Sequence, residues 1–144
     1  MELDRSKVLI AYNRLQALVQ EYRFDSRVLN VALLKNKARL EETATELNQK
    51  RSEIFQKHAA VWSEDEDLPD DVERGQMKTV RINGNDVPRW KNQDHADLAS
   101  EKLNSLFDGT EEVDVVTVPF EAMPIPEGET IEIWEPIEFM FVDE

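Results

Sequence analysis

Apolar side chains return at every seventh position along the longest uninterrupted stretch of this chain, residues 26 to 62. The stretch contains neither glycine nor proline. Its heptad positions are Leu33, Leu40, Leu47, Ile54 and Val61. This spacing predicts one continuous helix, about 55 Å long at a rise of about 1.5 Å per residue. We therefore expect the rest of the chain to be arranged around what this helix can bury.

A second helical pattern occupies residues 3 to 22. Its apolar side chains follow the i, i+3, i+4, i+7 rule of an amphipathic helix; they are Val8, Ala11, Tyr12, Leu15, Leu18, Val19 and Tyr22. Residues 23 to 26 interrupt the pattern, and Asp25 or Ser26 can cap the free amides of the next helix. This predicts an antiparallel, coiled-coil-like hairpin. A single longer helix is the alternative, because no glycine or proline forces a turn.

The first helix is too short to cover all of the long one, so residues 48 to 62 need another partner. This part carries large apolar side chains at Ile54, Phe55, Val61 and Trp62. The alternate heptad positions, Lys37, Ala44, Arg51 and His58, are too polar for a strong parallel coiled-coil dimer. We expect the four apolar residues to contact the C-terminal part of the chain, a second copy, or both, and we predict self-association.

Residues 63 to 76 are dominated by carboxylates. The acidic positions are Glu64, Asp65, Glu66, Asp67, Asp70 and Asp71. So dense a run cannot be buried, and Pro69 ends any helix, so the segment is predicted to be a solvated acidic loop. It does not fit a calcium-binding EF-hand loop, because the glycine required at the sixth position is absent.

The period of the pattern changes to two after residue 76. Residues 77 to 82 and 87 to 90 predict two strands, joined by a tight turn at Asn83-Gly84, a pair that adopts positive φ angles easily. Pro88 lacks an amide donor, which places the second strand at an edge.

A third helix is predicted from residue 93 to residue 107, where Asp108-Gly109 closes it. The alternation from 112 to 120 predicts the best strand of the chain. The predicted fold class is therefore α+β, with a long N-terminal helical hairpin and a small acidic C-terminal α/β domain of short antiparallel strands. The predicted domains are 1–62 for the hairpin, 63–76 for the acidic loop and 77–144 for the small domain.

The C-terminal tail is broken by prolines and rich in aromatic side chains. Its short apolar segments span residues 130 to 134 and 137 to 142. We expect Trp134, Phe139 and Phe141 to dock onto the distal end of the long helix and to share in the apolar protein interface predicted there. We predict that Trp62, Trp90 and Trp134 form a shared core, with a ligand cage or a protein interface as the alternatives.

Charge is distributed unevenly along the chain, whose net charge is −14. Residues 1 to 62 carry 11 Lys and Arg against 8 Asp and Glu, whereas residues 63 to 144 carry 6 against 23. The acidic part should be repelled by phosphates, so direct nucleic-acid binding is not expected. The imbalance has two interpretations: it keeps the protein soluble, or it complements a basic partner.

Composition also bears on the compartment. The chain has no cysteine, which removes disulfides and suggests an intracellular setting. The N-terminus lacks the basic-then-apolar order of a secretion signal, and no apolar run of about 18 residues is present to cross a bilayer. We expect a cytoplasmic protein that does not associate with a membrane.

No motif in the sequence names a chemical activity. The two histidines are His58, in the heptad seam, and His95, near the start of the third helix; His95 and Asp97 could share a metal, but no third ligand accompanies them. Gly-rich phosphate loops and nucleophile motifs are absent. We therefore expect no cofactor, no metal and no catalytic residue, and predict that the protein is not an enzyme.

The order of elements, together with the segments 103–107, 113–115, 119–120 and 137–140, resembles a family of small phage and prophage proteins of uncharacterised function. The resemblance implies a bacteriophage origin, with a role in particle assembly or in managing the host, and location in the host cytoplasm or the phage particle. The predicted function is a non-enzymatic protein–protein interaction protein in assembly, with phage or host proteins as partners. The alternative is an acidic inhibitor of a host defence protein, acting as a nucleic-acid mimic or by sequestering a ligand.

Overall fold

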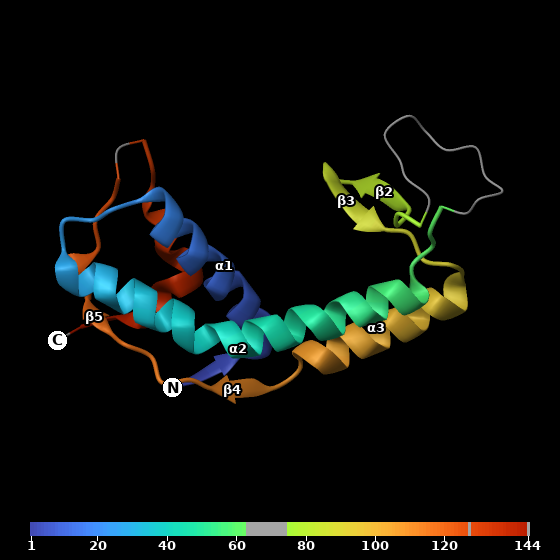
Figure 1. The fold of residues 1–144 in the computed structure, drawn as a ribbon, viewed down its shortest axis with the longest axis horizontal. Helices are drawn as coiled ribbons and strands as arrows, with labels where there is room; N and C mark the ends of the chain where they lie inside the picture. The colour runs from blue at the N-terminus through green and yellow to red at the C-terminus, as the bar shows by residue number, and fades with distance from the viewer. Residues whose placement is uncertain (63–74, 127, 144) are drawn as a thin grey trace. The chain divides into compact units, whose positions relative to one another are not determined.

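The computed structural model describes residues 1–62, 75–126 and 128–143. The chain combines helices with short strands, as an α+β protein does (Figure 1). The elements are, in chain order, β1 (Glu2–Asp4), α1 (Arg5–Glu21), α2 (Arg27–His58), β2 (Thr79–Ile82), β3 (Asn85–Pro88), α3 (Gln93–Phe107), β4 (Thr110–Glu112), β5 (Val118–Pro119), η1 (Phe120–Ala122), η2 (Ile131–Met140) and β6 (Phe141–Val142). The elements η1 and η2 are 3₁₀ helices.

The contacts within the chain group it into two compact units. Unit 1 contains Met1–Asn48 and Phe107–Glu144, and unit 2 contains Gln49–Leu106. The boundary falls inside α2, so one helix supplies residues to both units. The predicted domain boundaries at residues 62 and 76 refer to parts of the chain that would fold by themselves. The two compact units do not test this, so the boundaries stay a prediction.

Helix α2 begins where the sequence predicts and ends four residues early. The Ser26 hydroxyl accepts a hydrogen bond from the Leu29 amide at 3.2 Å, which caps the start of the helix. After His58 the backbone turns to β-bridges, since the Ala60 amide donates to the Arg89 carbonyl at 2.7 Å and Val61 pairs with Met77. The prediction of helix up to residue 62 is therefore wrong for its last residues, because neighbouring extended chain takes their backbone hydrogen bonds.

Helix α1 buries the face that the sequence predicts, including Val8, Ala11, Leu15 and Leu18. Its closest backbone neighbours are η2 and β1 (Figure 1). The predicted coiled-coil-like packing of α1 along α2 is not confirmed. The helix predicted from residue 3 begins only at Arg5, because Leu3 and Asp4 belong to β1, which pairs antiparallel with β4 so that Leu3 lies opposite Glu111.

The predicted strand from 112 to 120 is wrong for its central part. Strands are present only at its two ends, and residues 113–117 have no regular structure. The side chain of Asn36, in α2, takes the place of a neighbouring strand: its Oδ1 accepts from the Val116 amide at 2.7 Å, and its Nδ2 donates to the Val116 carbonyl at 2.9 Å. Arg39 likewise donates to the Asp114 carbonyl at 2.7 Å. The extended segment is therefore held by side chains of a helix.

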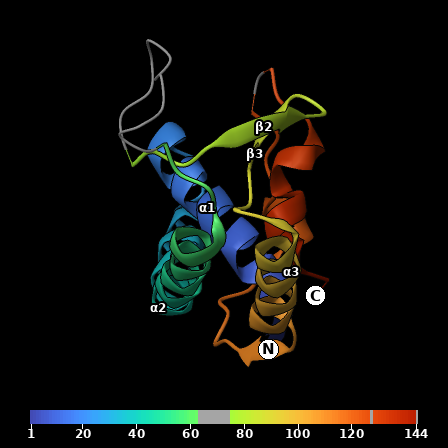
Figure 2. The same cartoon turned by 90° about the vertical axis from the view of Figure 1, so that its right-hand side faces the viewer.

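Each sheet in the described part of the chain has two strands. The sequence predicts only antiparallel strands, and this is wrong for one of the pairs. β1 with β4 and β2 with β3 are antiparallel, whereas β5 and β6 are parallel. The β2–β3 hairpin, seen as a ribbon in Figure 2, turns at Asn83 and Gly84, whose φ angles are 51° and 81°. This confirms the predicted turn, although β3 begins at Asn85, earlier than the predicted residue 87, because a tight turn allows pairing to start at once.

Candidate functional site

A row of aromatic side chains fixes the C-terminal tail within unit 1. Neighbouring ring centroids are separated by 5.7 Å for Tyr22 and Phe24, 5.4 Å for Phe24 and Trp134, 5.3 Å for Trp134 and Phe141, and 6.3 Å for Phe141 and Phe120. The indole of Trp134 donates to the Pro124 carbonyl at 2.6 Å. The row joins the tail to the connection between α1 and α2. The prediction that the tail docks on the distal end of the long helix is therefore corrected, because Phe24 offers the aromatic partner.

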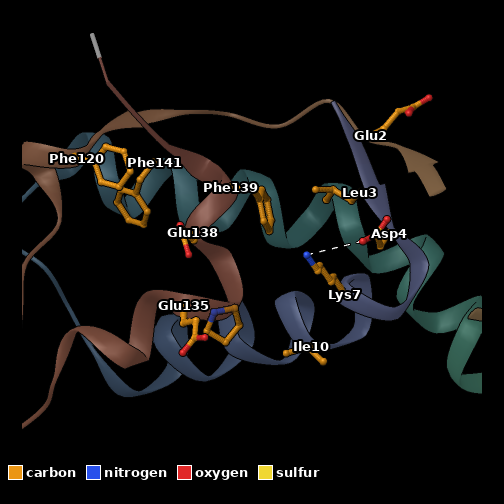
Figure 3. A pocket seen from close by; sticks show the side chains of 11 residues that line it. Glu2, Leu3, Asp4, Lys7, Ile10, Phe120, Glu135, Glu138, Phe139 and Phe141 are labelled. Atoms are coloured by element: carbon orange, nitrogen blue, oxygen red, sulfur yellow. Dashed lines mark ion pairs between the residues drawn. The ribbon is translucent and has the colours of Figure 1, made fainter. Parts of the chain in front are cut away.

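Next to this row lies an open groove with a volume of about 750 Å³. We call it the acidic groove; the residues that line it are Glu2, Leu3, Asp4, Lys7, Ile10, Phe120, Glu135, Pro136, Glu138, Phe139 and Phe141. Figure 3 shows Glu135, Glu138 and Phe139 on the η2 side and Leu3, Asp4 and Lys7 on the β1–α1 side. Two of its apolar residues, Ile10 and Phe120, are exposed.

The η2 wall of the acidic groove comes from two short 3₁₀ segments joined at a kink, where Ile137 has a φ angle of −123° and a ψ angle of 22°. Burial repeats every three residues across the kink. Trp134, Ile137 and Met140 are buried. Glu135 and Glu138 are exposed together, while Pro136 and Phe139 are half-buried together. The segment therefore turns two carboxylates and a phenyl ring toward the groove.

The β1–α1 wall adds one ion pair and one further carboxylate. Lys7 Nζ lies 3.8 Å from Asp4 Oδ2. Glu2, Glu135 and Glu138 form no ion pair within the described parts of the chain. The groove thus combines an apolar lining with three uncompensated negative charges.

Other carboxylates of the C-terminal part are neutralised within unit 1. Glu112 pairs with the N-terminal amine at 2.7 Å, and Glu111 pairs with Arg5 at 2.9 Å. Asp114 lies 3.4 Å from Arg39. The mildly basic N-terminal part therefore compensates acids on strand β4 and the segment after it, whereas the carboxylates of Glu2, Glu135 and Glu138 at the acidic groove are not compensated in this way.

The predicted interface residues belong to two different units, and their gathering into one surface stays a prediction. Phe139 and Phe141 both line the acidic groove, and Trp134 is buried beneath Phe141 in the aromatic row. The other four belong to unit 2: Ile54 and Phe55 are half-buried, Val61 is exposed and Trp62 is half-buried. Phe55 packs on Trp90, with ring centroids 5.7 Å apart, and the Lys78 ammonium lies 4.7 Å from the Trp62 ring.

The predicted core of three tryptophans is corrected, because Trp134 takes Phe24 and Phe141 as partners. The predicted acidic surface of Glu64, Asp65, Glu66, Asp67, Asp70 and Asp71 lies outside the described residues.

Sequence reasoning missed the carboxylates of the groove. A signal was present in the segment 134–140, where aromatic or apolar, acidic and apolar positions repeat every three residues. That three-residue repeat does not fit a strand, whose period is two, and it places Glu135 and Glu138 on one face of a helical segment.

Unit 2 contains a histidine–lysine cluster, made of His58, His95 and Lys102. The two Nδ1 atoms of His58 and His95 lie 2.8 Å apart, and Lys102 Nζ lies 3.2 Å from Nε2 of His58. His58 is only 1% exposed. An ammonium can only donate, so Nε2 of His58 accepts from Lys102 and Nδ1 of His58 donates to His95. This chain of hydrogen bonds needs a neutral His58 ring.

The surroundings of the cluster favour that neutral ring. Burial is the largest cause that lowers the pKa of His58, followed by the electrostatic effects of Lys102, His95, Lys57 and Lys91. Burial and Lys57 also lower the pKa of Lys102. Within the described part of the chain, no three His, Asp or Glu side chains are placed to hold a metal together. The Asp97 carboxylate, which could have paired with His95, accepts a hydrogen bond from Gln93 at 2.9 Å.

None of the helices described here has an apolar stretch of the length needed to cross a membrane. Comparisons of the chain with protein-family models, with curated proteins and with solved structures found no match.

Proposed function

We propose that this chain is a non-enzymatic, phage-type protein–protein interaction protein that acts in particle assembly, and that the acidic groove is its recognition surface. The observation that supports the proposal is the combination of exposed apolar side chains with Glu2, Glu135 and Glu138, which have no cationic partner in the described chain. The partner has an apolar stripe bordered by Lys or Arg. The chain works in the bacterial host cytoplasm or in the phage particle.

The chemistry of the groove explains why a basic amphipathic segment suits it. Ile10, Phe120 and Phe139 offer apolar area whose removal from water favours binding. The carboxylates attract cations over a distance and fix the register of the bound segment. The negative field extends further, because residues 103–144 contain no Lys or Arg.

A synthetic amphipathic helix made of Leu and Lys tests the proposal. A peptide of the same composition, scrambled so that the Leu residues form no stripe, is the matched control. Fluorescence anisotropy of the labelled peptide should show saturable binding of the first peptide only. Replacing Glu135 and Glu138 by Lys should weaken that binding at least about tenfold, which corresponds to about 1.4 kcal/mol. Equal binding of both peptides, or binding that the two substitutions leave unchanged, would refute the groove as the recognition surface.

A second candidate function is an acidic inhibitor of a host defence or other host protein. It is favoured by the charge of residues 63 to 144, where 23 Asp and Glu face 6 Lys and Arg. A nucleic-acid mimic acts through many carboxylates and should displace DNA from a basic DNA-binding protein at low salt. Failure of rising amounts of the chain to displace DNA from such host proteins would rule out inhibition by nucleic-acid mimicry.

A further inference from the structure

Helix α2 carries an exposed apolar stripe with cations at its border. We call it the α2 stripe; its residues are Arg27, Val28, Val31, Leu34 and Lys35. Val28, Val31 and Leu34 are 65%, 40% and 53% exposed, and at about 100° per residue they lie within an arc of about 120° on one side of the helix. Arg27 and Lys35 fall in the same arc. Neither cation has an ion-pair partner among the residues that the structure describes.

The α2 stripe has the chemistry that the acidic groove requires. It offers three neighbouring apolar side chains, and its two cations match the carboxylates of Glu2, Glu135 and Glu138. An amphipathic helix can bind in this way by laying its apolar face into an apolar groove. We propose that the acidic groove binds the α2 stripe of a second copy of this chain, so that copies join head to tail. This inference rests on the proposed function of the groove.

The two surfaces share no residue, since the residues that line the groove come from β1, α1, η1, η2 and β6. Each copy therefore keeps a free groove after its stripe is bound, and a free stripe after its groove is filled. A contact between two different surfaces continues into a ring or a filament. The sequence predicts self-association through residues 48 to 62, whereas this proposal places the contact at the first turns of α2. Phe55 and Trp62 already have aromatic or cationic neighbours in unit 2.

Sedimentation velocity of the full chain measures the association. We expect the average mass to rise with protein concentration up to about 100 µM in about 50 mM salt. The rise should shrink in about 500 mM salt, where the Debye length falls toward a few ångströms and the charge pairs are screened.

Two variants separate the two surfaces. Glu135→Lys with Glu138→Lys disables the groove, and Val31→Asp disables the stripe by placing a carboxylate against an acidic surface. Asp and Val have similar helix propensities, so Val31→Asp should leave α2 folded. We expect each variant alone to be a monomer. An equimolar mixture should form a dimer that does not grow with concentration, because the groove of one variant binds the stripe of the other and the remaining surfaces are disabled.

Two control variants carry the same changes elsewhere. Glu121→Lys with Glu132→Lys alters the net charge equally at exposed residues outside the groove, and Ile125→Asp alters an exposed apolar residue outside the stripe. Both should associate as the native chain does. Circular dichroism and the fluorescence of Trp134 check that every variant is folded.

Each other outcome overturns the inference. A native chain that stays a monomer shows that the stripe is not the occupant; if it still binds the Leu–Lys helix through Glu135 and Glu138, the proposed function stands without the second copy. If the two variants remain monomers when mixed, the contact is not head to tail. If either variant associates as well as the native chain, the surface that it alters is not part of the contact.

Discussion

At the scale of single residues, Asn36 holds together segments that are far apart in the sequence. Its side chain is 1% exposed, exchanges two hydrogen bonds with the backbone of Val116, and lies 3.8 Å from the sulfur of Met140. The sequence gives no sign of this role, because an Asn within a heptad pattern is usually interpreted as a polar surface residue. Its position on the buried side of α2 decides that residues 113–117 lie along a helix and not along a strand.

Replacing Asn36 by Leu should destabilise unit 1 by about 1–3 kcal/mol, because the amide and carbonyl of the half-buried Val116 would both lose their partner and an unsatisfied group shielded from water costs roughly 1–3 kcal/mol. Urea unfolding followed by the fluorescence of Trp134, in a background where Trp62 and Trp90 are replaced by Phe, measures the change. Glu42→Leu, at an exposed position of the same helix, should shift the free energy of unfolding by less than about 0.5 kcal/mol. An Asn36→Leu variant as stable as the native chain would contradict the role assigned to Asn36.

His58 gives the second prediction at this scale. Its pKa is lowered in the folded chain by burial and by Lys102, His95, Lys57 and Lys91, so the unfolded chain, with a histidine pKa near 6.5, takes up the proton first as the pH falls. The stabilising contribution of the neutral ring should be complete above about pH 6.5 and decrease below it. His58→Gln, which can still accept from Lys102, should show a smaller decrease between about pH 7.5 and 5.5 in the urea midpoint. An equal decrease in both proteins would show that His58 is not the titrating group.

At the scale of elements, the sequence predicts best where local chemistry decides the structure. The bounds of α3 match the predicted residues 93 and 107, because Asn92 accepts from the His95 amide at 3.0 Å and Gly109 adopts a φ of 90° after the helix. Local patterns fail where a distant segment decides. The alternation of residues 112 to 120 is genuine, yet Asn36 supplies the hydrogen bonds that a strand would supply. The acidic groove could not be predicted from a local pattern, because its η2 wall is two short 3₁₀ segments joined at a kink at Ile137 and its other residues come from β1, α1, η1 and β6.

The docking of η2 through Phe24 can be tested at this scale. Phe24→Leu removes the ring that contacts both Tyr22 and Trp134, and aromatic pairs contribute about 0.5–1.5 kcal/mol each beyond the burial of apolar area. We expect a loss of about 1–2 kcal/mol in the free energy of unfolding and faster amide hydrogen exchange in residues 131–142. The matched control is Phe107→Leu, at a half-buried phenylalanine without a ring pair among the described residues. Exchange in residues 131–142 that does not respond to Phe24→Leu would show that the aromatic row does not hold the tail.

At the scale of the whole molecule, the apolar burial is concentrated in unit 1. Its buried side chains include long apolar residues of α1, α2 and η2, such as Leu15, Leu33 and Ile137. In unit 2 the buried residues, among those that the structure describes, are His58, Ala59 and Ala99. Since burial of a large apolar side chain contributes about 1.5–3 kcal/mol and an alanine far less, unit 2 should be the less stable part. The heptad pattern conceals this difference, because it runs through both units without a break.

Hydrogen exchange measured by mass spectrometry should show this difference along the single helix α2. Amides of residues 27–47 are expected to exchange slowly, with the core of unit 1, and amides of residues 49–58 faster, because local unfolding of a part with little apolar burial needs less free energy. Lowering the pH from about 7.5 to 5.5 should widen the gap after correction for the intrinsic exchange rate, since protonation of His58 favours the open form of unit 2. In the His58→Gln variant the gap should respond less to pH. Equal protection along all of α2 would mean that the two units unfold together, and the stability of the acidic groove would then depend on the histidine–lysine cluster as well.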